Sequence, residues 1–146
     1  MRSGAPTPQP GSPSLYAVLE ASPNAIVAAD GDGRIQYVNR QVEATFGYRV
    51  DELLGASVER LLPTGVAERH VAHRRAFHAR PTARPMGIGM DLAGRRKDGS
   101  TFPVEISLSP VETLDGVLVF ATIVDISARK AAERQLLQAQ KLESIG

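Results

Sequence analysis

The stretch from Thr101 to Ser109 alternates apolar and polar side chains, and a turn sequence lies on either side of it. An alternation with a period of two is typical of a strand with one buried face. The turn sequences are Lys97-Asp-Gly-Ser100 and Leu114-Asp-Gly116, in which glycine supplies the positive φ that tight turns need. The two turns, the alternating stretch and the segments 86–96 and 117–126 together predict three consecutive antiparallel strands. The apolar members of the alternation are Phe102, Val104, Ile106 and Leu108.

A second hairpin is predicted near the start of the chain. The apolar run Ala25–Ala29 leads into Asp30-Gly-Asp-Gly33, and Arg34–Val38 then alternates again. Short helices are predicted around this hairpin, because apolar residues recur at helical intervals and breaker sequences end most of the runs. Asn39 is placed to cap one of these helices through its side-chain oxygen. The predicted helices span residues 14–22, 39–47, 50–55 and 58–62, so the fold class is α+β.

The longest central helix is predicted over Pro63–Arg80. Four of its residues recur at i, i+4, i+7 and i+11 and therefore share one inward face. They are Val66, His70, His73 and Phe77, whereas Arg69, Arg74, Arg75 and His78 fall largely elsewhere. Between Arg69 and Lys97 there are seven arginines and one lysine against a single acid. Because no nucleic-acid-reading helix is recognisable there, we interpret this basic segment as a solvated face and expect no nucleic acid as partner.

Composition excludes several classes of protein. The chain has 146 residues, 42% of them hydrophobic, which is enough for one buried core. Its apolar runs are much shorter than the roughly 18 residues of a membrane span, so no membrane segment is expected within the chain. The absence of cysteine excludes disulfides, thiolate metal ligands and a cysteinyl-flavin adduct. Residues 1–13 contain four prolines and no apolar stretch, so we interpret them as a disordered leader.

Catalytic motifs are not recognisable in the sequence. Gly87-Ile-Gly89 lacks the third glycine of a phosphate-binding loop, and no serine, histidine and acid are spaced as a triad. The acids Asp51 and Glu52 are interpreted as residues that favour the start of a helix. We therefore expect a regulatory domain and not an enzyme.

Five motifs that occur in order resemble those of PAS domains. They are Asp30–Asn39, Phe46-Gly-Tyr48, Glu52-Leu-Leu-Gly55, Arg96–Ser107 and Asp125-Ile-Ser127. The resemblance covers residues 14–127 and implies a PAS fold, which has a five-stranded antiparallel sheet with short helices over one face. It also implies an N-terminal helix, a ligand pocket and a C-terminal signalling helix. In such an input module, Asp125, Ile126 and Ser127 are expected to transmit the signal from the last strand to the exit helix.

Residues 128–146 are predicted to form a helix similar to the segment that precedes the phosphoacceptor-histidine helix of bacterial sensor histidine kinases. The resemblance implies a cytoplasmic protein of two-component signal transduction, with C-terminal kinase domains as partners in its full length. An apolar stripe recurs at three or four residues, which favours a homodimer through a coiled coil, although a solvated unpaired helix is the alternative. The stripe consists of Ala132, Leu136, Ala139, Leu142 and Ile145.

The central helix and the following strand are similar to those of haem-binding oxygen-sensor PAS domains. His70 occupies the position of their axial histidine, and Gly87-Ile-Gly89 follows at matching spacing. The resemblance implies haem b as cofactor, with His70 as the ligand of the haem iron. Met90 stands where an arginine is expected and cannot donate a hydrogen bond to bound oxygen, which favours His–Met ligation or binding of carbon monoxide or nitric oxide. The other implied cofactor-binding residues are Ile88, Phe77, Arg84, Ile106 and Leu108.

Other occupants of the pocket stay open. A histidine on an apolar face is often a hydrogen-bonded core residue, in which case the pocket holds an undetermined small molecule or the chain is a ligand-free dimerisation domain. Non-covalent flavin is unsupported, because the chain has no tryptophan and few aromatic residues. A metal site of His70, His73 and His78 is disfavoured because His78 faces away from the other two and no carboxylate or thiolate lies at ligand spacing.

Overall fold

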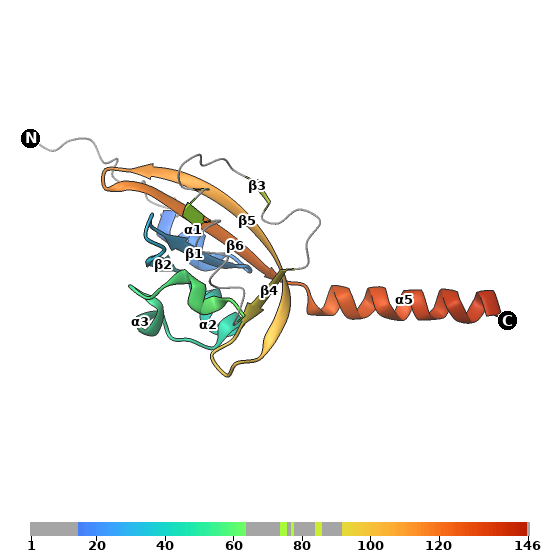
Figure 1. Ribbon diagram of the computed structural model, residues 1–146. Coiled ribbons are helices and arrows are strands. Elements are labelled where there is room, and N and C mark those ends of the chain that lie inside the picture. The colour runs from blue at the N-terminus through green and yellow to red at the C-terminus, as the bar shows by residue number, and fades with distance from the viewer. Residues whose placement is uncertain (1–14, 64–73, 76, 78–83, 86–91, 146) are drawn as a thin grey trace, which may run out of the picture.

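The structure is a computed structural model that describes residues 15–63, 74–75, 77, 84–85 and 92–145 (Figure 1). Its centre is one antiparallel sheet with the order β2-β1-β6-β5-β3, in which β4 also pairs with β5. The strands are β1 (Ala25–Ala29), β2 (Ile35–Val38), β3 (Arg84–Pro85), β4 (Leu92–Arg95), β5 (Thr101–Thr113) and β6 (Gly116–Asp125). The predicted α+β class and its antiparallel sheet are confirmed, and the two-residue β3 adds to the five predicted strands.

The hairpin turns lie where the glycine sequences predict them. Gly33 and Gly99 have φ angles of 78° and 89°, a region that favours glycine. The backbone N–H of Asp30 donates to the carbonyl of Arg34 at 3.0 Å, which closes the β1–β2 turn. The N–H of Arg96 donates to the carbonyl of Ser100 at 2.8 Å, which closes the β4–β5 turn in the same way.

Strand β5 continues to Thr113 and does not end at Ser109 as predicted. Its register with β6 runs without a break from Val104 opposite Asp125 to Thr113 opposite Gly116. The alternation on which the prediction rested ends at Ser109, and the next residue, Pro110, has no N–H to donate to a ladder. Among the described residues, β3 and β4 pair with β5 only as far as Leu108. Pro110 therefore lies where β5 is an edge strand, and proline is tolerated there.

Short helices cover one face of the sheet, and one long helix leaves it. The short ones are α2 (Arg40–Phe46), α3 (Val50–Leu53) and the 3-10 turn η1 (Val58–Leu61), while α1 (Leu15–Ala21) precedes β1. Helix α5 (Ser127–Ile145) starts at the end of β6 and projects away from the sheet (Figure 1). Of the predicted central helix, the residues Arg74, Arg75 and Phe77 are described, and all three are helical. The predicted leader, residues 1–13, lies outside the described residues.

The core joins the short helices to the inner face of the sheet. The rings of Phe46 on α2 and Phe102 on β5 meet edge to face, with centroids 5.3 Å apart. A Cβ at Gly94 would lie 3.0 to 3.1 Å from atoms of these two rings, so glycine on β4 permits their close approach. The buried cluster includes Val27, Ile35, Val42, Phe46, Leu53, Leu61, Phe102, Val104, Ile106 and Ile123.

Asn39 occupies the N-cap position of α2, but its side chain does not cap the helix. It is fully buried, and its Oδ1 accepts from the backbone N–H of Ile26 at 2.9 Å. Its Nδ2 donates to the carbonyls of Leu19 and Asn24 at 3.0 and 2.9 Å. The predicted capping role is therefore wrong. The amide instead holds together α1, β1 and the loop between them.

Helix α1 packs on the outer face of the sheet through aromatic rings. Tyr37 on β2 and Phe120 on β6 both pair with Ala28 of β1 and therefore share a face. Their ring centroids are 6.5 Å apart, and the centroid of Tyr16 on α1 lies 6.1 Å from that of Tyr37. The hydroxyl of Tyr37 donates to Oε1 of Glu20 on α1 at 2.9 Å. Burial and this hydrogen bond raise the pKa of Tyr37 above the usual range of a phenol.

Candidate functional site

The inner face of the sheet carries the part of the predicted pocket that the structure describes. Ile106 is buried and Leu108 is half-buried, and they point to the same face of β5. Their register partners on β6 are Ile123 and Ala121, which belong to or pack against the same core cluster. Phe77, in the helical segment, is also buried. Ile106, Leu108, Ile123 and Ala121 together form an apolar wall, and apolar linings are typical of pockets for small molecules.

Strand β3 brings a further predicted residue to this region. The backbone of Arg84 pairs with that of Leu108, which places β3 directly beside the apolar wall. Three further residues of the predicted site, His70, Ile88 and Met90, lie outside the described residues. So do His73 and His78, which the alternative metal site would need. The roles assigned to all of them stay predictions.

Arg74 was expected on a solvated face of the central helix, and the structure contradicts this. Its side chain is only 11% exposed and forms an ion pair with Glu59 of η1, with Nη2 lying 2.9 Å from Oε1. The neighbouring Arg75 is exposed, as expected for a solvated face. A signal for the difference existed in the sequence, because Arg74 lies three residues before Phe77 and so borders the inward stripe. The sequence does not show that Glu59 is the acid with which Arg74 forms an ion pair.

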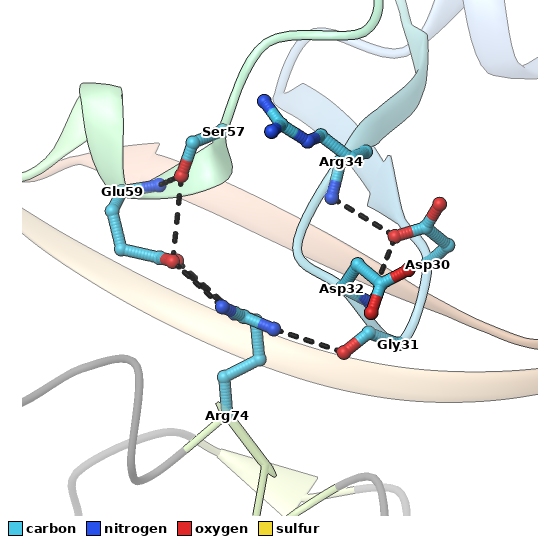
Figure 2. A network of polar contacts seen from close by, with 7 residues as sticks. All are labelled: Asp30, Gly31, Asp32, Arg34, Ser57, Glu59 and Arg74. Carbon is cyan, nitrogen blue, oxygen red and sulfur yellow. Dashed lines mark hydrogen bonds and ion pairs between the residues drawn. The ribbon is translucent and has the colours of Figure 1, made fainter.

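The partners of Arg74 are fixed by short-range hydrogen bonds (Figure 2). The N–H of Glu59 donates to Oγ of Ser57 at 3.3 Å, which orients the start of η1. On the other side, Oδ1 of Asp30 accepts from the N–H groups of Asp32 and Arg34 at 3.0 and 2.9 Å. These bonds shape the β1–β2 turn, whose Gly31 carbonyl accepts from Nη1 of Arg74 at 2.9 Å.

The junction between β6 and α5 contains the predicted transmission residues. Oδ1 of Asp125 accepts from the N–H and the Oγ of Ser127 at 2.9 and 2.6 Å, which satisfies the first turn of α5. Ile126 is buried, and its N–H donates to the carbonyl of Pro103 at 3.1 Å. Oδ2 of Asp125 lies 3.3 Å from Nη2 of Arg96. The structure therefore joins the end of β6, the start of α5 and the β4–β5 turn at one carboxylate.

Two contacts around this junction were not predicted from the sequence. The guanidinium of Arg96 lies over the ring of Phe102, 4.1 Å from its centroid, and so connects Asp125 to the core. Nη2 of Arg129, in the first turn of α5, lies 2.7 Å from Oε2 of Glu105 on β5. This hydrogen bond raises the pKa of Arg129. Both side chains of the second pair are more than half exposed, so it orients α5 more than it stabilises the fold.

The described residues contain no group of three or more histidine, cysteine, aspartate or glutamate side chains that could hold a metal ion. Within the same part of the chain, no helix combines the length and the apolar character needed to cross a membrane. These findings concern neither the predicted histidines of the central helix nor the ends of the chain.

The sheet order, the helices over one face and the strand-to-helix junction define a PAS domain. Residues 23–128 match the PAS domain family, and the chain belongs to that family. PAS domains are regulatory sensor modules and not catalytic units. The fold predicted from the five sequence motifs is thus confirmed.

Two sequence relatives of the chain are sensor proteins. The chain is 26% identical over 126 residues to the sensor protein FixL of Bradyrhizobium diazoefficiens, an alignment that covers 86% of this chain and 25% of FixL. It is 25% identical over 124 residues to the oxygen sensor protein DosP of Escherichia coli, covering 85% of this chain and 16% of DosP. The chain therefore spans a quarter or less of these relatives.

A solved structure supports the same assignment. The PAS domain of the HTR-like protein of Haloarcula marismortui aligns with a TM-score of 0.65 and 30% identity, covering 77% of this chain and 88% of that one. This neighbour and the family model thus agree that the chain has a PAS fold.

Proposed function

We propose that the chain is the sensory input module of a longer, cytoplasmic sensor histidine kinase. Residues 14–127 form the sensor, and residues 128–146 lead toward C-terminal kinase domains. A small ligand, a gas or a redox change acts beside the apolar wall of Ile106 and Leu108. The resulting shift passes through Asp125, Ile126 and Ser127 into α5, along which a second copy of the chain pairs.

The continuity of β6 with α5 carries this proposal. Ile106 on the wall pairs with Ile123, two residues before Asp125, so one strand links the wall to the junction. Oδ1 of Asp125 then accepts a hydrogen bond from the N–H of Ser127, the first residue of α5. A shift of β6 therefore changes the start of the helix directly. A switch of this kind needs two states that differ by only a few kcal/mol and a ligand that prefers one of them.

A chimera in which the chain replaces the sensory region of a histidine kinase tests this route. We expect Asp125→Ala to change basal autophosphorylation severalfold, because α5 loses both the bond to its first turn and the tie to Arg96. Asp115→Ala is the matched control, since Asp115 is an exposed acid in the β5–β6 turn. Equal autophosphorylation in the two variants and the parent chimera would contradict the route through Asp125.

We also propose haem b as the ligand, held by His70. The sequence pattern around His70 and Gly87-Ile-Gly89, the apolar described wall and the relative named an oxygen sensor protein support this choice. Bound haem would supply an iron atom at which a diatomic gas binds. The neutral imidazole of His70 would hold that iron. The other residues predicted to contact the haem are Met90, Ile88, Phe77, Arg84, Ile106 and Leu108.

Titration of the purified chain with haemin tests this second proposal. A Soret band that saturates at one haem per chain is expected for the wild type, and His70→Ala should abolish it. His78→Ala is the matched control and should keep the band, because His78 falls on another face of the predicted helix. A wild-type chain without a Soret band would exclude haem and leave the sensory role to another ligand.

A further inference from the structure

The chain contains four Asp-Gly dipeptides, at residues 30–31, 32–33, 98–99 and 115–116. In this dipeptide the glycine nitrogen can attack Cγ of the aspartic acid, because glycine has no side chain to obstruct the approach. The nitrogen loses its proton and the protonated carboxyl loses its hydroxyl, together one water, and a succinimide ring forms. Water then adds to either ring carbonyl and opens the ring, which gives aspartate again or isoaspartate. The reaction needs a free carboxyl group and a glycine nitrogen that can turn toward it.

The carboxylates of two of these dipeptides are held by hydrogen bonds. Oδ1 of Asp30 accepts from two backbone N–H groups, and its Oδ2 accepts from Nε2 of Gln36 at 3.0 Å. Oδ1 of Asp98 accepts from the N–H and the hydroxyl of Ser100 at 2.9 and 2.6 Å. The bonds from Ser100 lower the pKa of Asp98, so that its reactive acid form is scarce.

In the dipeptide Asp32-Gly33, the glycine is the residue that is held. The N–H of Gly33 donates to the carbonyl of Asp30 at 3.0 Å, and its carbonyl accepts from the N–H of Val58 at 2.8 Å. A Cβ at Gly33 would lie 2.5 Å from Cζ of Arg74, so a guanidinium also fills the space beside this glycine. The nitrogen of Gly33 therefore cannot turn toward Cγ unless the turn separates from η1.

The fourth dipeptide, Asp115-Gly116, is restrained much less. From the part of the chain that the structure describes, no hydrogen bond or ion pair reaches the carboxylate of Asp115. Its N–H donates to Oγ1 of Thr113 at 3.3 Å, and this hydroxyl donates to the carbonyl of Gly116 at 2.6 Å. Thr113 and Gly116 are also the last pair of the β5–β6 ladder. The contacts of this turn are thus local to the hairpin.

The end of the β5–β6 hairpin projects from the sheet. Strand β1 pairs with β6 no further than Val119, and β3 pairs with β5 no further than Leu108. In the described sheet, residues 109–113 and 116–118 therefore pair only with each other, and the tip extends past β1 and β2 (Figure 1). The free end of a ladder opens locally at little cost in free energy. Such opening releases the nitrogen of Gly116 while the domain stays folded.

We propose that Asp115-Gly116 is a modification site at which isoaspartate forms in the folded protein, while the fold protects the other three dipeptides. The product carries an exposed carboxylate that an S-adenosylmethionine-dependent carboxyl methyltransferase can esterify. In that step the methyl group passes from the sulfonium to a carboxylate oxygen and S-adenosylhomocysteine leaves. The proposal is independent of what the sensory pocket binds.

Storage of the full chain at about pH 5, where part of an ordinary aspartate is protonated, tests the site. Peptide mapping by mass spectrometry then distinguishes isoaspartate from aspartate at each position. We expect isoaspartate to form at residue 115 at least about tenfold faster than at 30, 32 or 98, the factor that one charge-assisted hydrogen bond contributes. In guanidinium chloride the four positions should react at similar rates. Similar rates in the folded chain, or reaction at residue 115 only after unfolding, would overturn the proposal.

Two variants separate the chemistry from general instability. Asp115→Glu keeps the charge but would have to close a six-membered ring, so it should abolish both the product and methyl transfer to the folded chain by an isoaspartyl methyltransferase. Ser100→Ala removes the hydroxyl bond to Asp98 and should speed reaction at residue 98 severalfold, with residue 115 unchanged. Methyl transfer that persists in Asp115→Glu, or no gain at residue 98 in Ser100→Ala, would contradict the proposed site and its selectivity.

Discussion

Two polar side chains, the fully buried Asn39 and the mostly buried Arg74, hold together segments that are distant in the sequence. Asn39 connects β1 to the end of α1 and to the loop that follows it, and Arg74 connects its helical segment to η1 and the β1–β2 turn. The hydrogen bonds of both side chains lie outside the backbone hydrogen bonds that pair the strands. Each satisfies polar groups in places where regular structure ends, and buried groups of this kind are expensive to leave unpaired.

Replacing Asn39 by alanine should destabilise the domain by about 3 kcal/mol, since three hydrogen bonds are lost and their backbone partners stay buried. Urea unfolding followed by circular dichroism measures this change. Gln138→Ala removes an exposed amide on α5 and should change the free energy of unfolding by no more than about 0.5 kcal/mol. A loss below about 1 kcal/mol in Asn39→Ala would show that water replaces the amide.

These two residues also mark the limit of prediction from the sequence. Asn39 before a helix is typical of a cap, and that local pattern gives no hint of Ile26 or Leu19 as partners. Arg74 amid other basic residues is typical of a solvated face, and its acid lies fifteen positions away. Long-range polar contacts depend on the finished fold, so a local pattern cannot reveal them.

At the scale of helices and strands, local sequence patterns predict the structure better than they predict long-range polar contacts. The β1–β2 and β4–β5 hairpins were predicted correctly, because the glycine turn and the alternating strands are short-range features. The extension of β5 beyond Pro110 was missed, because it depends on which edge of that strand is paired. The outer-face position of α1 was not predicted either, since it rests on contacts of Tyr16 and Glu20 with Tyr37 of β2.

The contact of α1 with the sheet should weaken at alkaline pH. Since the folded-state pKa of Tyr37 is raised, its contribution to stability is fully present below about pH 10 and is lost as the pH rises toward the raised value. Ionisation would then place a phenolate beside the carboxylate of Glu20. We expect the free energy of unfolding to fall more between about pH 8 and about pH 11 in the wild type than in Tyr37→Phe.

The phenylalanine variant serves as the control for other groups that titrate in this range. It keeps the ring contacts with Tyr16 and Phe120 and removes only the ionisable hydroxyl. At neutral pH it should be less stable than the wild type by about 1 kcal/mol, the value of one hydrogen bond. Parallel alkaline losses in the two proteins would exclude Tyr37 as the responsible group.

At the scale of the whole molecule, a buried core contrasts with an exposed helix. Every described side chain of α5 from Ala131 to Leu142 is exposed, including Leu136, Leu137 and Leu142 at 61%, 57% and 71%. Leu136 and Leu142 belong to the apolar stripe that the sequence predicts. Exposed leucines along one helix are consistent with the proposed pairing of two copies.

Sedimentation tests this pairing directly. We expect the full chain to sediment as a dimer at micromolar concentration, and a chain that lacks residues 128–146 to sediment as a monomer. Replacing Leu136 and Leu142 together by glutamine should have the same effect as the truncation, because the stripe loses its apolar character. Leu114→Gln, in the exposed β5–β6 turn, should leave the dimer intact. A monomeric wild-type chain would exclude the coiled coil.

The direct passage of β6 into α5 makes the helix a lever with its fulcrum at Asp125. Its 19 residues correspond to a length of about 28 Å. A tilt on the order of 10° at Asp125 would displace the far end sideways by about 5 Å. In the transmission that we propose, a small tilt at the sheet would therefore become a sideways displacement of several ångströms at the tip of α5.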